Sequence, residues 1–351
     1  MEQEPLLDVR DLRLSVTTHR GEASILDGVS FTLREGKVTC LVGESGCGKS
    51  VTSLTIMGLQ HPLSAGKKPA LRASGEIRFQ GENLLALTDA QMEAKRGDKI
   101  AMVFQEPMTS LNPVLTIGEQ LAEAVRTHRP QLSPQEVEAK VLSTLEKVNI
   151  SGQGRLDEYP FQLSGGMRQR IMIAMALIND PKLLIADEPT TALDVTVQAQ
   201  ILKLMKNLQD EHQASILFIT HDLGVVAEIA DDVIVMYGGR VVESGPVEEV
   251  FRDPQHPYLI GLLNSIPRIG EHRETLQTIQ GMVPPVTAMP SGCRFRTRCP
   301  FAAEQCAELP PATHHQADHV SHCWFTPLER HFSLTDNQPT PSQEKEPHHA
   351  N

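Results

Sequence analysis

An octapeptide near the N-terminus has the residue types and spacing that bind a nucleotide phosphate. Residues Gly43–Ser50, GESGCGKS, fit the pattern Gly-x4-Gly-Lys-Ser/Thr, between an apolar stretch and a helix-like stretch. The glycines let backbone N–H groups turn inward, Lys49 would reach the β- and γ-phosphates of ATP, and the Ser50 hydroxyl would ligate Mg²⁺. The predicted ATP contacts are Gly43, Glu44, Ser45, Gly46, Cys47, Gly48, Lys49, Ser50 and Val51.

Two adjacent carboxylates follow an apolar stretch later in the chain, in LLIADEP at Leu183–Pro189. Asp187 fits the role of holding Mg²⁺, and Glu188 fits the base that polarises an attacking water. Adjacent carboxylates on a surface loop are usually solvated and inert. At the carboxyl end of a buried strand, in a chain with a phosphate loop, they indicate the second half of an ATP site.

A third segment, LSGGMRQR at Leu163–Arg170, begins a predicted helix. A hydroxyl followed by two glycines at this point exposes free N–H groups, which favour an anion. By itself Ser164-Gly165-Gly166 is a weak signal and could be a flexible turn.

Taken together, the motifs resemble the ATP-binding cassette (ABC) family. Gln105, the LSGG segment, ADEPT, Ala192-Leu193-Asp194 and Thr220-His221-Asp222 follow the phosphate loop in the order typical of that family. The resemblance covers about residues 6–250. It implies a P-loop cassette with a mixed sheet and a helical subdomain, in which two cassettes pair head to tail.

The same resemblance implies roles for single residues. Each ATP would lie between one subunit's phosphate loop and its partner's Ser164-Gly165-Gly166. Gln105 would contact Mg²⁺ and the attacking water while its segment contacts a membrane subunit. His221 would bridge the γ-phosphate, and Asp194 would pass the state of one site to the other.

Two positions depart from the family pattern. Met167 replaces the glutamine of many cassettes, which leaves the Ser-Gly-Gly anion site intact. An aromatic residue that stacks on adenine is expected near the end of the first strand, where the sequence reads Val16-Thr17-Thr18-His19. Either His19 stacks on the base or the base is held loosely.

Other segments resemble the importer group for dipeptides, oligopeptides and nickel. They are QEPMTSLNPVLTIGEQ at Gln105–Gln120, HPY at His256–Tyr258, and SGCRFRTRCPFAAEQC. The resemblance implies an ATPase subunit that works with a second ATPase, identical or different, two membrane permease subunits and an extracellular or periplasmic solute-binding protein. Import of nickel, metal chelates or another small solute is the alternative, and a soluble ABC ATPase of DNA repair or translation is a third reading.

Four cysteines crowd into the last sixth of the chain: Cys293, Cys299, Cys306 and Cys323. The spacings C-x5-C, C-x6-C and C-x16-C lack the C-x2-C knuckle typical of structural zinc. They resemble the cysteine cluster of dipeptide-type ATPase subunits, which implies a [4Fe–4S] cluster. Zinc with nearby histidines such as His314 and His319 is an alternative, and disulfides are a third that a reducing compartment disfavours.

The elements that must position these residues alternate in type. Residues 6–16, 29–42, 75–79, 100–104, 183–186 and 216–220 read as strands, the last two buried and parallel. Helical spacing is seen at 50–59, 117–128, 133–150, 197–209 and 256–267, and Ser133-Pro134 resembles a helix start. These patterns predict an α/β fold: a cassette over 1–252 with a helical subdomain near 107–166, a Cys/Pro-rich extension over 253–330, and a disordered tail over 331–351.

Composition narrows the function further. The net charge of −12 and an aromatic content of 4% argue against a nucleic-acid partner. The longest apolar run, Ile171–Ile178, is far below the roughly 18 residues that a bilayer span requires. The chain is therefore expected to be cytosolic or to sit on a membrane through partners, and the importer resemblance implies a peripheral subunit on the cytoplasmic side of the inner (plasma) membrane.

Overall fold

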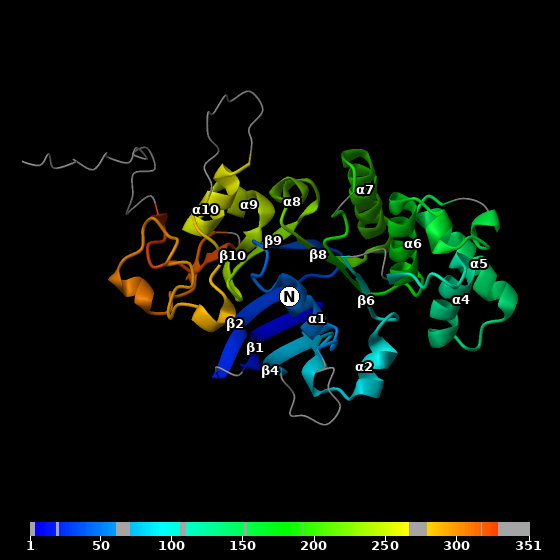
Figure 1. Cartoon of the computed structure of the whole chain (residues 1–351), viewed down its shortest axis with the longest axis horizontal. Helices are drawn as coiled ribbons and strands as arrows, with labels where there is room; N and C mark the ends of the chain where they lie inside the picture. Colours follow the sequence, from blue (N-terminus) through cyan, green and yellow to red (C-terminus); the bar gives the residue numbers. More distant parts are fainter. Residues whose placement is uncertain are drawn as a thin grey trace, which may run out of the picture.

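The structure is a computed structural model that describes residues 4–18, 21–60, 71–105, 110–150, 153–191, 193–266, 279–316 and 318–328. Two sheets organise the described residues (Figure 1). The larger has the strand order β11-β12-β10-β9-β3-β8-β7-β6 and the smaller the order β2-β1-β4-β5. The predicted α/β class is confirmed, and the sheet is mixed because β9, β3, β8, β7 and β6 pair in parallel whereas β10 runs antiparallel to β9.

The strands have the following bounds: β1 Leu7–Thr18, β2 Gly21–Leu33, β3 Val38–Val42, β4 Leu71–Phe79, β5 Glu82–Asn83, β6 Ile100–Val103, β7 Leu183–Asp187, β8 Ser215–Thr220, β9 Asp232–Tyr237, β10 Arg240–Pro246, β11 Thr313–His314 and β12 Val320–Ser321. The helices are α1 Lys49–Ile56, α2 Asp89–Lys95, α4 Ile117–His128, α5 Pro134–Lys147, α6 Gly165–Leu177, α7 Val195–His212, α8 Leu223–Ile229, α9 Val247–Arg252 and α10 Pro257–Asn264.

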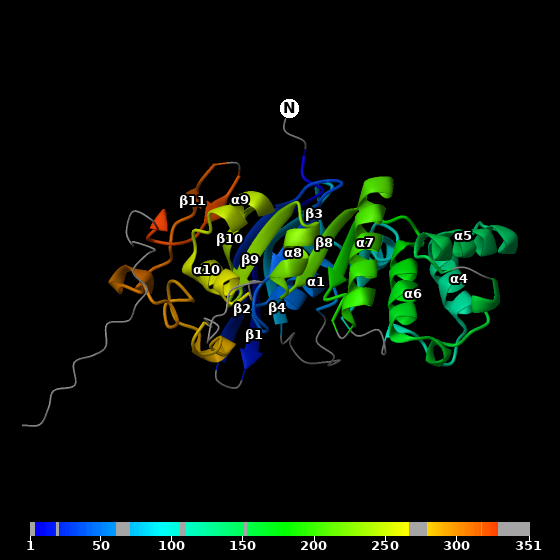
Figure 2. The ribbon, with the colours of Figure 1, turned by 90° about the horizontal axis from the view of Figure 1, so that it is seen from above.

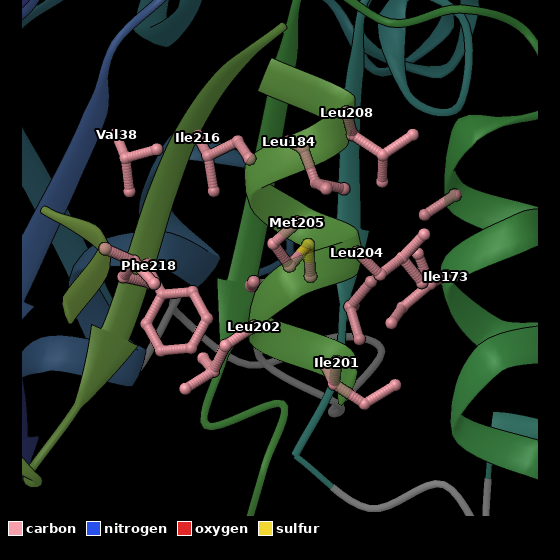
Figure 3. Close-up of a cluster of buried hydrophobic side chains, with 14 of the residues drawn as sticks. Val38, Ile173, Leu184, Ile201, Leu202, Leu204, Met205, Leu208, Ile216 and Phe218 are labelled. Carbon is pink, nitrogen blue, oxygen red and sulfur yellow. The ribbon is translucent and has the colours of Figure 1, made fainter. Parts of the chain in front are cut away.

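Both faces of the large sheet are buried, because successive side chains of a strand point to opposite faces. In β8, Ile216 and Phe218 join one core cluster while Leu217 and Ile219 join the other. The first cluster packs the sheet against α7 and α6, as Figure 3 shows for Leu184, Leu204 and their neighbours. The second packs the sheet against β1, β2 and β4 through residues such as Leu12 and Phe79. The near-continuous apolar sequences of the central strands follow from this double burial.

Helix α4, helix α5 and the α6 that they contact extend beyond the β6 edge of the sheet (Figures 1 and 2). The first residues of α4 and α5 carry capping motifs that can be recognised in the sequence. The Thr116 and Ser133 hydroxyls accept hydrogen bonds from Glu119 and Glu136, whose carboxylates accept from the cap N–H groups in return. Pro134 occupies the first turn of α5, which confirms the start predicted at Ser133-Pro134.

The C-terminal extension is attached to the same sheet at its other end (Figure 2). Strand β12 pairs with β10 through Glu243 and Ser244. The fully buried Glu243 carboxylate accepts hydrogen bonds from the backbone N–H groups of Gln255 and His256 and lies 2.7 Å from His319 Nε2. The predicted boundary near residue 252 is thus crossed by a strand pair and a buried polar contact. The predicted tail over 331–351 lies outside the described residues.

Candidate ATP site

The phosphate loop connects β3 to α1, and its conformation requires glycine. Gly43 has φ +150°, and a Cβ there would lie 2.2 Å from the Met236 carbonyl oxygen. Gly48 has φ +106°, and a Cβ there would lie 2.8 Å from Leu26 Cδ2. Gly48 also caps α1, so the first N–H groups of the helix open into the loop. The loop therefore supplies backbone donors and a helix dipole to an anion.

The Lys49 side chain is buried and turns back into the loop. Its Nζ donates to the carbonyl oxygens of Gly43 (2.7 Å) and Glu44 (3.2 Å). An ammonium group held by uncharged carbonyls keeps its full charge for an incoming phosphate.

Ser50 and Asp187 meet across 137 residues of sequence. The Ser50 hydroxyl at the start of α1 donates to Asp187 Oδ1 at the end of β7, at 3.1 Å. Burial raises the pKa of Asp187, partly opposed by the hydrogen bond from Ser50. A hydroxyl and a carboxylate are the hard oxygen donors that Mg²⁺ prefers, so this pair fits the predicted magnesium site.

Glu188 is contacted by side chains from three other positions. Gln105 Nε2 donates to Oε2 (3.1 Å), the Thr191 hydroxyl donates to the same oxygen (2.9 Å), and His221 Nδ1 lies 3.2 Å from Oε1. Glu188 adopts φ +46°, and its N–H donates to the Ile219 carbonyl of β8. The structure therefore brings together Gln105, Glu188 and His221, the three residues predicted to be catalytic.

The pKa of Glu188 is lowered by these contacts. Burial raises it, but the hydrogen bonds from Thr191 and His221 outweigh that effect. The carboxylate is ionised at neutral pH and can orient and polarise a water molecule. Thr191 is absent from the predicted site residues, although its place three residues after Glu188, at the turn that follows a strand, was a usable signal.

The LSGG segment lies apart from this group. Ser164 caps α6 by accepting from the Met167 N–H (3.3 Å), and Ser164 and Gly165 are exposed. Asp194 caps α7 in the same way, accepting from the Val197 N–H (2.9 Å). Within the described ranges, no hydrogen bond joins Ser164-Gly165-Gly166 to the phosphate loop of the same chain. His19, the candidate for adenine stacking, lies outside the described residues.

The four late cysteines are free thiols. The pKa of Cys299 is raised to about 12 and that of Cys323 to about 11, mainly by burial, with a smaller contribution from the other cysteines and an opposing one from a backbone hydrogen bond. In the parts of the chain that are described, no group of three or more His, Cys, Asp or Glu side chains is arranged to hold a metal ion. The described geometry therefore gives no direct sign of the predicted [4Fe–4S] site.

No described helix is both long enough and apolar enough to cross a membrane.

Known proteins match this chain over most of its length. A family model described as ABC transporter matches residues 26–191, and one described as oligopeptide/dipeptide transporter, C-terminal region, matches residues 242–306. A putative peptide import ATP-binding protein of Brucella ovis is 50% identical over 92% of this chain and 98% of its own. The dipeptide transport ATP-binding protein DppD of Bacillus subtilis is 49% identical over 92% of this chain and 95% of its own.

Solved structures agree. A bacterial ABC transporter cassette solved as a dimer superposes with a TM-score of 0.60 at 28% identity, over 69% of this chain and 98% of that one. The cbiO1 protein of Clostridium perfringens, part of the cbiONQ transporter complex, superposes with a TM-score of 0.59 at 28% identity, over 72% and 92%. The chain belongs to the ABC transporter family of ATPases and carries the C-terminal region of its oligopeptide/dipeptide branch.

Proposed function

We propose that this chain is the ATP-hydrolysing subunit of an importer for dipeptides or oligopeptides. The observation that supports the ATPase activity best is the Glu188 carboxylate, which contacts Gln105, Thr191 and His221 and lies next in sequence to Asp187 of the Ser50–Asp187 pair. Support for a peptide cargo comes from the named relatives, which match both the cassette and the extension.

The residues divide the work of hydrolysis. Lys49 and the loop N–H groups would bind the β- and γ-phosphates, and Ser50 and Asp187, with Gln105, would hold Mg²⁺. When bound, the ion neutralises phosphate charge. Glu188 orients the attacking water and accepts its proton, while Gln105 and His221 fix the direction of the carboxylate.

The second half of each site would come from another cassette. Ser164 and Gly165 are exposed, and Val195, next to Asp194, is 84% exposed although it is apolar. Exposed N–H donors and an exposed valine beside them suit a contact with a partner. A head-to-tail pair would close each ATP between one chain's Lys49 and the other's Ser164-Gly165-Gly166, and Asp194 would sense the closure.

This chain has an apolar surface on which a membrane subunit would dock. An apolar groove of about 300 Å³ is lined by Met57, Leu59, Met102, Phe104, Met172 and Met175. Phe104 is 40% exposed and directly precedes Gln105. A permease helix seated in this groove would bring the chain to the cytoplasmic face of the membrane and would couple directly to Gln105.

We further propose that Cys293, Cys299, Cys306 and Cys323 hold a [4Fe–4S] cluster with a structural role. Three of them occur in the repeated pattern Cys-x-Phe, and the backbone N–H of each phenylalanine lowers the pKa of its cysteine against the effect of burial. Hydrogen bonds from backbone to sulfur are a regular feature of iron–sulfur ligands. When bound, the cluster would replace the thiol protons and cross-link the extension.

The cluster has a direct test. Protein purified without oxygen should be brown, absorb near roughly 400 nm and contain about four irons per chain. Replacing any of the four cysteines with serine should bleach it, while Cys40→Ser should not. Stoichiometric zinc without iron would refute the proposal.

Cargo is tested with the assembled transporter. Vesicles that contain this chain, its membrane subunits and the second ATPase should accumulate labelled dipeptides when ATP and the solute-binding protein are present. Uptake of nickel or a metal chelate but not of peptides would contradict the peptide assignment. Recovery of the chain on ribosomes or DNA, without membrane subunits, would contradict the transport function.

A further inference from the structure

Two side chains of the C-terminal extension bind the phosphate loop at a single residue, Glu44. The Tyr258 hydroxyl of α10 accepts a hydrogen bond from the Glu44 N–H, at 2.8 Å. The Arg298 guanidinium donates to both carboxylate oxygens of Glu44, at 2.7 and 3.1 Å. Both contacts join segments that are more than two hundred residues apart in the sequence.

Arg298 is itself fixed from several sides. Its side chain is 6% exposed, and it donates to the backbone carbonyls of Gln280 (2.9 Å) and Gly281 (3.1 Å). The guanidinium carbon lies 5.7 Å from the centre of the Tyr237 ring. Because its other partners hold Arg298 in place, the guanidinium restricts the movement of Glu44 and does not move with the phosphate loop.

Tyr258 is anchored by packing. It is fully buried, with its ring centre 4.8 Å from that of Tyr237 and 5.4 Å from that of Phe295. Phe295 and Arg298 belong to the cysteine-rich loop that begins at Cys293. The aromatic cluster therefore connects β9, α10 and the cysteine-rich loop to the phosphate loop.

The contacts of Tyr258 and Arg298 hold the part of the phosphate loop that binds the Lys49 side chain. The Gly43 and Glu44 carbonyls accept from Lys49 Nζ, so fixing Glu44 fixes the position of the phosphate-binding ammonium. The pairing also neutralises a carboxylate that would otherwise repel the ATP phosphates. A loop ordered before binding loses less entropy when the nucleotide arrives.

We propose that Arg298 and Tyr258 are positioning residues for nucleotide binding, through which the C-terminal extension sets the affinity of the phosphate loop for ATP. The proposal rests on the assignment of this loop to ATP. It gives the extension a function in the ATPase cycle that does not depend on whether the cysteines bind a metal.

The test compares two arginines of the same loop. Arg298→Ala should weaken MgATP binding to the full chain about fivefold, because an ordered loop and a neutralised carboxylate are lost together. The matched control is Arg296→Ala, since Arg296 donates to Ser291 Oγ of its own loop. Its dissociation constant should stay within about twofold of the parent's. Calorimetry in the Glu188→Gln background prevents hydrolysis during the measurement.

In the assembled transporter, Arg298→Ala should raise the KM for ATP and leave kcat within about twofold, because the variant weakens binding rather than chemistry. A double-mutant cycle then separates positioning from general stability. In the Glu44→Gln background, removing Arg298 should cost less than twofold, since its partner charge is already gone. A merely structural role would give the same loss in both backgrounds.

Tyr258→Phe provides a second variant, because it removes the acceptor of the Glu44 N–H and keeps the ring. It should weaken ATP binding about threefold. If Arg298→Ala fails to fold, Arg298→Lys takes its place, with partial loss expected. Normal ATP affinity in both Tyr258→Phe and a folded Arg298 variant would overturn the proposal. Failure of the unsubstituted chain to bind ATP would instead refute the ATP site itself.

Discussion

Glu188 receives side-chain contacts from three other positions, and two of these contacts, from Thr191 and His221, lower its pKa. Gln105 follows β6, Thr191 lies in the turn after β7, and His221 follows β8. Parallel strands end at the same edge of a sheet, which brings these positions together. The resulting carboxylate accepts hydrogen bonds on both oxygens and remains charged despite its partial burial.

The first prediction tests this carboxylate. Glu188→Gln should retain ATP binding and lower turnover at least about a hundredfold, because an amide cannot accept the proton of the attacking water. Lys49→Ala should instead weaken nucleotide binding, since it removes the charge that meets the phosphates. Binding and hydrolysis are measured separately. Near-normal hydrolysis by the glutamine variant in the assembled transporter would show that another group is the base.

Residues of contiguous motifs were predictable, whereas contacts across the fold were not. Gly43–Ser50 and Asp187-Glu188 carry their geometry in a strand–turn–helix or strand–turn segment, so sequence alone indicates how they act. The contacts of Tyr258 and Arg298 with Glu44 depend on how α10 and the cysteine-rich loop pack against β9. No local pattern encodes that packing, which is why neither residue was among the predicted site residues.

At the scale of elements, central strands were predicted better than the sheet's far edge. Strands β7 and β8 read as apolar runs because both of their faces are buried. Strands β9 and β10 are missing from the sequence-based expectations. In β10 the register shifts between Val241 and Glu243, and Glu243 is a buried acidic residue in the middle of the strand. Both features break the apolar pattern by which strands are recognised.

Asp27 of β2 ties three elements together, and this tie is sensitive to pH. Its carboxylate pairs with Arg13 of β1, Arg240 of β10 and Arg294 of the extension. Burial raises the pKa of Asp27, but the three arginines together lower it by more than burial raises it, so the net shift is downward. A lowered pKa contributes stability above the unfolded value of about 3.9, and the contribution is lost as pH falls through the folded value.

The second prediction follows from this sign. Asp27→Asn should lower the free energy of unfolding by about 2 kcal/mol at pH 7, because Arg240 and Arg294 lose their partner charge and Arg13 loses one of its two. The difference from the unsubstituted chain should shrink as pH falls below about 4. Thermal unfolding at a series of pH values measures it. Asp11→Asn, which removes an exposed carboxylate near Arg13, should change little at any pH.

The third prediction concerns the apolar groove beside β6. Phe104→Ser should weaken recovery of the membrane subunits with this chain, since it removes an exposed ring from the groove and leaves ATP binding unchanged. Leu309→Ser is the control, because Leu309 is 61% exposed and does not line the groove. Equal recovery with both variants would exclude the groove as the docking surface.

On the scale of the whole molecule, acidic side chains of the cassette help to join the extension to it. Glu243 accepts hydrogen bonds from the backbone N–H groups of Gln255 and His256 and contacts the His319 ring. Asp27 pairs with Arg294, and Glu44 pairs with Arg298. The last contact reaches the phosphate loop itself. An extension fastened in this way moves with the cassette core, so a change in it is transmitted to the nucleotide site.

The last prediction concerns the assembly that completes the site. The isolated chain should hydrolyse ATP slowly, because its Ser164-Gly165-Gly166 segment makes no hydrogen bond to its own phosphate loop within the described residues, and Ser164 and Gly165 are exposed. Hydrolysis should rise when the second ATPase, the membrane subunits and the solute-binding protein are supplied. Ser164→Arg should lower hydrolysis by the complex at least twofold, since it blocks the site on the partner's loop.

The same variant should leave ATP binding by the isolated chain unchanged, because its own phosphate loop is intact. Lys49→Ala is the matched opposite: it should weaken ATP binding by this chain and leave the Ser164 segment able to serve the partner. ATPase rates at several protein concentrations and calorimetric ATP titrations separate the two effects. A fast ATPase whose specific activity does not depend on the concentration of the isolated chain would mean that one cassette completes its site alone.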